Sequence, residues 1–151
     1  MDRNAPTRSS RTRQQTARIL GWAGVLPFAA WTLVAWTGAP DWLEELLTGY
    51  GILILAFMGG TLWSASLDRP DESEAPLVAS IILVLAALPA TLLPTVSAAL
   101  LLAVLFALHW TAEYLWVRGS QPGWYRRMRL GITSAVVTLL VLNTLIRLGG
   151  G

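Results

Sequence analysis

The chain's single histidine, His109, precedes Glu113 by one helical turn, so the two side chains are expected on one face of a helix. An imidazole beside a carboxylate is a combination used in acid–base catalysis and proton transfer. A metal site normally needs about three or four ligands, and the chain has no cysteine, so the pair does not indicate a metal. His109 and Glu113 therefore form a candidate polar site with no catalytic role or cofactor assigned.

A basic aromatic segment, "PGWYRRMR", follows this pair. Guanidinium groups bind phosphate, and Trp and Tyr favour the membrane interface, so the segment is a candidate site for an anionic lipid headgroup. The alternative is that these side chains only anchor and orient the chain in a membrane. The residues concerned are Trp124, Tyr125, Arg126, Arg127 and Arg129.

The composition indicates which solvent surrounds these groups. Of the 151 residues, 54% are hydrophobic and 13% charged, whereas soluble domains carry roughly 25% charged residues. A domain of this size cannot hide so much apolar surface from water, so lipid must surround much of it. The net charge is only +2 and the arginines lie at the ends of apolar segments, which does not favour nucleic acid as a partner.

Five apolar segments are long enough to cross a bilayer, for which about 20 residues are needed. Since a crossing segment must satisfy its own backbone hydrogen bonds, each is predicted to be a helix. The predicted fold is therefore all-α: a bundle of five transmembrane helices over residues 19–148. A basic cytoplasmic tail, residues 1–18, is expected to be disordered. The predicted spans are 19–36, 46–67, 77–93, 97–117 and 130–148.

The third and fourth spans require a reversal of the chain near Pro89 and Pro94, in "ATLLPT". The alternative is one kinked, tilted helix. Five spans place ten of the eleven arginines on one side and leave Arg147 on the other, in agreement with the positive-inside rule. The N-terminus is then inside and the C-terminus outside. Because all the basic residues are Arg and Ala and Leu are abundant, we expect a bacterial inner-membrane protein.

Other polar and small residues within the spans predict contacts between helices. Glu113 lies near the end of its span and is expected to meet Arg118 or an arginine of the next loop. Asn143 is expected to form a hydrogen bond between helices. A stripe of small residues at four-residue spacing predicts close packing within the bundle, with a homodimer as the alternative. The stripe consists of Ala56, Gly60 and Ser64.

Three segments, "LGWAGVLPF", "YGILILAFMGGTLW" and "PGWYRRMRLGIT", resemble domain of unknown function 3429. This family comprises small bacterial membrane proteins related to mitochondrial transmembrane protein 69, and the similarity covers about residues 18–146. Family members usually carry a histidine where this chain has Leu62 and a glycine where it has Ser64, and Glu113 corresponds to their acid before the basic loop. The resemblance implies an integral membrane protein of about five helices and no particular reaction.

Three functions are consistent with these features. The first is a non-catalytic inner-membrane scaffold, assembly or lipid-associating component, whose partners would be membrane lipids and an unidentified membrane protein. The alternative is a small proton- or solute-conducting protein that uses His109 and Glu113. The third is an intramembrane or lipid-modifying enzyme with the same two residues as acid and base, although no third catalytic group is evident.

Overall fold

The chain folds into helices joined by short connections. The computed structural model describes residues 8–38, 40–68 and 73–149, and no strand occurs among them. The helices are α1 (Arg8–Ala23), α2 (Leu26–Thr37), α3 (Asp41–Leu67), α4 (Ala75–Leu85), the 3-10 helix η1 (Leu88–Leu92), α5 (Thr95–Ala112), the π-helix η2 (Glu113–Val117) and α6 (Gly123–Gly149).

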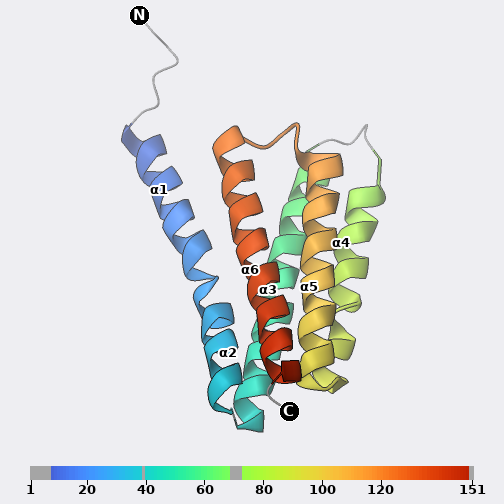
Figure 1. Ribbon diagram of the computed structural model, residues 1–151. Coiled ribbons are helices and arrows are strands. Elements are labelled where there is room, and N and C mark those ends of the chain that lie inside the picture. The colour runs from blue at the N-terminus through green and yellow to red at the C-terminus, as the bar shows by residue number, and fades with distance from the viewer. Residues whose placement is uncertain (1–7, 39, 69–72, 150–151) are drawn as a thin grey trace, which may run out of the picture.

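Within the described ranges, five helical stretches are long and apolar enough to cross a membrane. They run alternately up and down, so that α1 begins and α6 ends at opposite ends of the bundle (Figure 1). This confirms the prediction of an all-helical chain with five helices of that kind. The stretches are Arg11–Thr37, Asp41–Leu67, Ala75–Leu92, Thr95–Val117 and Gly123–Gly149.

Large apolar side chains cover the outside of the bundle. Leu53, Phe57 and Leu92 are examples of many that are mostly exposed. Soluble monomers rarely expose so much contiguous apolar surface, whereas hydrocarbon solvates it without cost. The surface therefore fits a multi-pass membrane protein.

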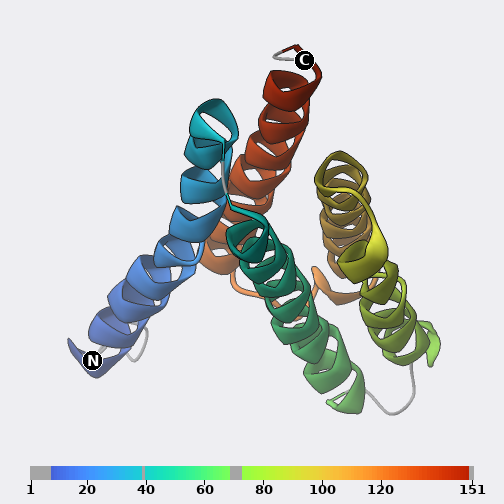
Figure 2. The same cartoon turned by 90° about the horizontal axis from the view of Figure 1, so that it is seen from below.

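The first crossing is made by α1 and α2, with a break between them at Gly24 and Val25. Pro27 lies in the first turn of α2 and has no backbone N–H to donate to the preceding turn, which explains the break. The Tyr50 hydroxyl of α3 donates to the freed Gly24 carbonyl at 2.9 Å. Toward its N-terminal end, α1 diverges from α6 (Figures 1 and 2).

Helix from Arg8 onward corrects the expectation that residues 1–18 form a disordered tail. Between Pro6 and Gly21 the sequence has no helix-breaking residue and is rich in Arg and Gln, which favour helix. The helix of the first crossing therefore continues beyond its apolar part. Residues 1–7 lie outside the described part of the chain.

Helix α3 packs on α4, α5 and α2, while α6 packs on α5 and α2. The buried face of α3 packs on an apolar core layer made by side chains of α2, α3, α5 and α6. These residues are almost completely buried, and all of them are apolar. The apolar core layer consists of Phe28, Leu55, Leu102, Phe106 and Leu140.

Close packing of α3 on α4 uses Gly59, not the predicted stripe of small residues. A Cβ atom on Gly59 would lie 3.4 Å from the Ser80 carbonyl oxygen and 3.4 Å from Val84 Cγ2, whereas one on Gly60 would meet nothing within 4 Å. Successive helical residues point about 100° apart, so the stripe of Ala56, Gly60 and Ser64 faces away from the seam. Gly60 and Ser64 are exposed, and the prediction that the stripe packs within the bundle is corrected.

The reversal between α4 and α5 lies where the two prolines predict it. Helix α4 ends at Leu85, η1 contains Pro89, and Pro94 immediately precedes α5. The backbone is extended at Leu93 and Pro94, and both residues are exposed. The structure therefore has two helices here and not the single kinked helix that was the alternative.

The different surroundings of Gly59 and Gly60 predict different effects of substitution on stability. Gly59→Leu should destabilise the bundle by about 1–3 kcal/mol, because the added side chain must enter the α3–α4 seam. Gly60→Leu is the matched control and should leave stability nearly unchanged. Thermal unfolding in detergent, followed by circular dichroism, measures both. A larger loss for Gly60→Leu would contradict this packing and point to an interface between copies.

Candidate functional site

A buried ion pair joins three crossing stretches near the end of the bundle where α1 begins. Glu113, the first residue of η2, is 3% exposed, and Arg129 of α6 is 7% exposed. Arg129 donates from Nη2 to Glu113 Oε1 at 2.7 Å and from Nε to Glu113 Oε2 at 3.1 Å. Thr61 of α3 donates its hydroxyl to the same Oε1. Arg129 is thus one of the arginines that the sequence predicts as partners of Glu113.

His109 lies one turn before Glu113 and is 0% exposed. Neither of its ring nitrogens has a hydrogen-bond partner among the described residues, and the same holds for Thr133 Oγ. The carboxylate of Glu113, the guanidinium of Arg129 and the backbone of Met58 are the polar groups close enough to act on the ring. The structure thus brings His109 and Glu113 to one buried face but joins them by no hydrogen bond.

Beside this ion pair, a cavity of about 330 Å³ opens between α5 and α6. Arg118 lies over the Tyr114 ring, 4.9 Å from its centroid, and Arg126 Nη1 donates to the Arg118 carbonyl at 3.3 Å. We call this space the arginine cavity, and its polar lining consists of Glu113, Gln121, Arg118, Arg126, Arg127 and Arg129. Since Glu113 neutralises Arg129, the other three arginines leave the lining strongly positive.

The predicted headgroup segment is divided between two faces of α6. Arg126 and Arg127 face the arginine cavity, whereas Trp124 and Tyr125 lie on the side of α1. Arg18 of α1 lies over the Trp124 ring, 5.8 Å from its centroid. Consecutive helical residues point in different directions, so these five residues cannot all converge on one ligand. Arg118, which was not included in the predicted site, completes the cavity from the end of η2.

A second buried charged cluster lies at the opposite end of the bundle and was not predicted. Glu44, in the first turn of α3, pairs with Arg147 of α6 and accepts a 2.6 Å hydrogen bond from Trp31 Nε1. Arg147 Nε donates to Asn143 Oδ1 at 3.1 Å, and Asn143 Nδ2 donates to the Trp31 carbonyl at 2.9 Å. These four residues, the Glu44 cluster, close a ring of hydrogen bonds. The bond from Asn143 to α2 confirms the predicted contact between helices.

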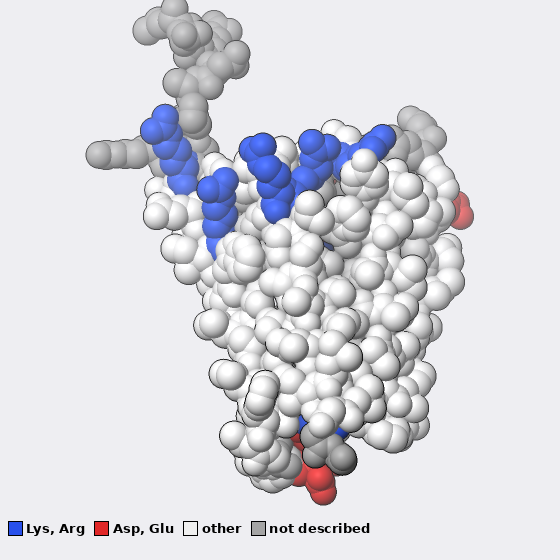
Figure 3. Space-filling model, in the orientation of Figure 1, with Lys and Arg blue, Asp and Glu red and all other residues white. Residues whose placement is uncertain are grey.

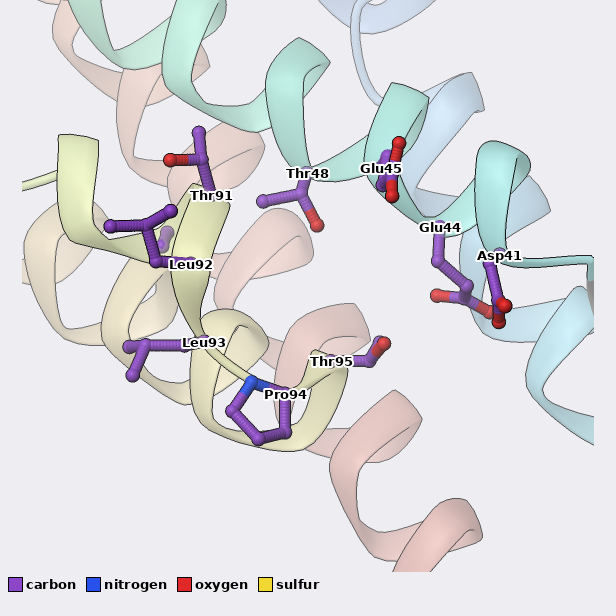
Figure 4. A pocket seen from close by; sticks show the side chains of 10 residues that line it. Asp41, Glu44, Glu45, Thr48, Thr91, Leu92, Leu93, Pro94 and Thr95 are labelled. Carbon is purple, nitrogen blue, oxygen red and sulfur yellow. The ribbon is translucent and has the colours of Figure 1, made fainter.

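The acidic side chains beside this cluster border a cavity of about 480 Å³. Figure 4 shows Asp41, Glu44, Glu45 and Thr48 on α3, with the turn between η1 and α5 opposite them. Among the described residues, no group of three His, Cys, Asp or Glu side chains is placed to hold a metal ion. Glu44 is already paired with Arg147, so the cavity gives no ligand set of its own.

The chain matches the family described as "Protein of unknown function (DUF3429)" over residues 13–145. The chain belongs to this family. The match includes Glu113 and Arg129, so this ion pair lies within the family region, whereas Arg147 of the second cluster lies two residues beyond its end. No curated protein and no solved structure matches the chain. The family description names no reaction.

The Glu113–Arg129 pair predicts strong coupling between two substitutions. Glu113→Ala or Arg129→Ala alone should cost about 3–5 kcal/mol of folding free energy, because each leaves the other charge buried and unpaired. The double variant should cost clearly less than the sum of the two. Unfolding equilibria in bicelles measure the cycle, with the exposed Glu45→Ala as control. Additive losses would show that the two charges are not paired in the bilayer.

Proposed function

We propose that this protein is a non-catalytic inner-membrane component that binds the phosphate of an anionic lipid in the arginine cavity. The carrying observation is the lining by Arg118, Arg126 and Arg127 of a cavity large enough for a small ligand group. Guanidinium groups make charge-assisted, geometrically directed hydrogen bonds to phosphate oxygens. Trp110 and Tyr114 line the same cavity and supply the apolar contacts expected at headgroup level.

The distribution of charge supports a position on the cytoplasmic leaflet. Arginines gather at the end of the bundle where α1 begins, over α1, α5 and α6 (Figure 3). At the opposite end Arg147 is neutralised by Glu44, while Asp41 and Glu45 remain exposed. Under the positive-inside rule the basic end faces the cytoplasm, so the N-terminus is inside and the C-terminus outside. The cytoplasmic leaflet is also the anionic one, which places lipid phosphates beside the arginine cavity.

The alternative of conduction has less support from the geometry. The apolar core layer lies between the Glu113 and Glu44 clusters, and its five side chains are almost completely buried. A proton or ion path needs a continuous series of polar groups or water, which these side chains interrupt. Glu113 is also held by three hydrogen bonds, which suits a fixed support better than a group that exchanges protons.

Binding in the arginine cavity predicts a loss of anionic lipid when its free arginines are removed. A variant with Arg118→Gln, Arg126→Gln and Arg127→Gln should retain phosphatidylglycerol at least about ten-fold less. The variant loses charge-assisted hydrogen bonds to the phosphate, and a loss of about 1.4 kcal/mol in binding free energy lowers affinity ten-fold. Native mass spectrometry after mild extraction from mixed phosphatidylglycerol and phosphatidylcholine vesicles gives the ratio. Arg129 is left intact because it supports the fold.

The control variant changes Arg11, Arg13 and Arg18 to Gln. It removes the same charge from exposed positions on α1, outside the cavity lining. It should retain the lipid within about two-fold, since none of these three arginines contributes a donor to the cavity. Equal retention by both variants would leave these arginines with anchoring alone and would overturn the proposed site.

The proposed orientation predicts which fusion reporters are active. Alkaline phosphatase, which folds only outside the cytoplasm, should be active after residue 151, and a green fluorescent protein at the same point should be dark. The reverse pattern is expected for both reporters at the N-terminus. A fluorescent C-terminal fusion with inactive phosphatase would contradict an outside C-terminus and the leaflet assigned to the arginine cavity.

A further inference from the structure

On the other side of α6 the divergence of α1 leaves a second cavity of about 340 Å³. It is bordered by α1, α3, α5 and α6, and its lining is mainly apolar; we call it the α1–α6 groove. Its volume lies within the range of small-molecule sites, roughly 300–1,000 Å³. The lining includes Leu20, Ile54, Met58, Ile132 and Val136. An occupant must therefore be largely hydrocarbon.

The lining of the α1–α6 groove includes a polar group without a hydrogen-bond partner. Thr133 is 5% exposed, lines the groove, and its hydroxyl makes no hydrogen bond with any described residue. Two other buried threonines are paired: Thr32 donates to the Phe28 carbonyl and Thr144 to the Leu140 carbonyl, each one turn back. Buried hydroxyl groups are normally paired, so the free Thr133 hydroxyl points to a partner supplied by a ligand.

The charge next to Thr133 indicates which kind of ligand group its hydroxyl can bind. Arg129 also lines the α1–α6 groove, but its guanidinium is engaged by Glu113 in two hydrogen bonds. The pair is electrically neutral, unlike the arginine cavity on the opposite face. A neutral acceptor such as a carbonyl oxygen fits Thr133, whereas a phosphate would find no uncompensated positive charge there.

Depth narrows the choice among neutral lipids. Thr133 lies six residues beyond Arg127 on α6, or ~9 Å further into the bilayer at ~1.5 Å per residue. Phospholipid headgroups stay at the level of the arginines. A lipid whose polar head descends to Thr133 must have a small, uncharged head. Quinones have such a head: a flat ring with carbonyl oxygens attached to a long hydrocarbon tail.

Aromatic side chains also line the α1–α6 groove. Phe57, Phe106 and Tyr125 all border the α1–α6 groove, from α3, α5 and α6. Aromatic side chains pack favourably on flat π-systems in offset or edge-to-face arrangements. We infer that the α1–α6 groove binds a membrane quinone, with a ring carbonyl accepting a hydrogen bond from the Thr133 hydroxyl and the tail leaving between α1 and α6. This inference concerns binding and is independent of the arginine cavity.

Titration with decylubiquinone tests the inference on the full chain in nanodiscs, with binding measured by calorimetry. Thr133→Val keeps the side-chain volume and should weaken binding about five- to ten-fold, the effect of one lost hydrogen bond. Its melting temperature without quinone should be unchanged or higher, since no protein hydrogen bond is removed. Unaltered affinity in Thr133→Val would overturn the assigned contact.

Two substitutions on α1 separate the groove from general effects on the helix. Ala17 lines the groove, so Ala17→Phe should fill it and abolish measurable binding; Ala23 is exposed and outside it, so Ala23→Phe should bind as wild type. Equal binding by both variants would overturn the site. So would equal competition by a decyl chain without a ring, which would show an apolar groove with no selectivity for quinone. Phosphatidylglycerol retention by Thr133→Val should stay normal, so this inference and the proposed function can fail separately.

Discussion

The constraint on which this fold depends is that hydrocarbon offers no partner to a buried charge. Helix α6 meets it twice, because Arg129 pairs with Glu113 and Arg147 pairs with Glu44. The two arginines lie eighteen residues apart, ~27 Å along the helix axis, close to the ~30 Å thickness of a bilayer core. Each ion pair thus lies near one border of the hydrocarbon, and together they fix the depth and rotation of α6 against α3 and α5. Between the two pairs the packing is mainly apolar, and apolar contacts do not require one particular orientation. The ion pairs therefore specify how α6 is placed against its neighbours.

The same ion pairs also affect the charge at the two ends of the bundle. In the orientation that we propose, Arg147 is the single arginine on the outer side, and its pairing with Glu44 neutralises it. At the other end Glu113 neutralises only Arg129, so Arg118, Arg126 and Arg127 remain cationic. Each pairing removes one positive charge from its end, so the basic end keeps its full excess of arginines and the other end has no free arginine among the described residues. A ligand with a phosphate has electrostatic reason to approach only one end.

Hydropathy and proline position were enough to predict the five helices, because span length and backbone satisfaction in lipid leave few alternatives. Local spacing likewise gave the shared face of His109 and Glu113 and an arginine partner for Glu113. The sequence pattern could not predict features that depend on how each helix is rotated or on which helices are neighbours. Gly59 and Gly60 are equally small, and only the position of α4 distinguishes them. Glu44 and Arg147 lie 103 residues apart, and their pairing required knowledge that the start of α3 meets the end of α6. Their opposite charges at the same predicted depth were the one available signal.

The ion pair between Glu113, the first residue of the π-helix, and Arg129 lies beside both cavities. Val117, the last residue of the π-helix, is 3% exposed and packs with Leu62 and Ala112, while Trp116 is 36% exposed. Glu113 accepts hydrogen bonds from Thr61 and Arg129 and also lines the arginine cavity. Arg129 borders both the arginine cavity and the α1–α6 groove. Neutralised by Glu113, it adds no charge to the groove, while its neighbours Arg126 and Arg127 keep theirs on the other side. The two cavities therefore share Arg129 but differ in charge. The carboxylate that neutralises Arg129 belongs to Glu113, the first residue of the π-helix.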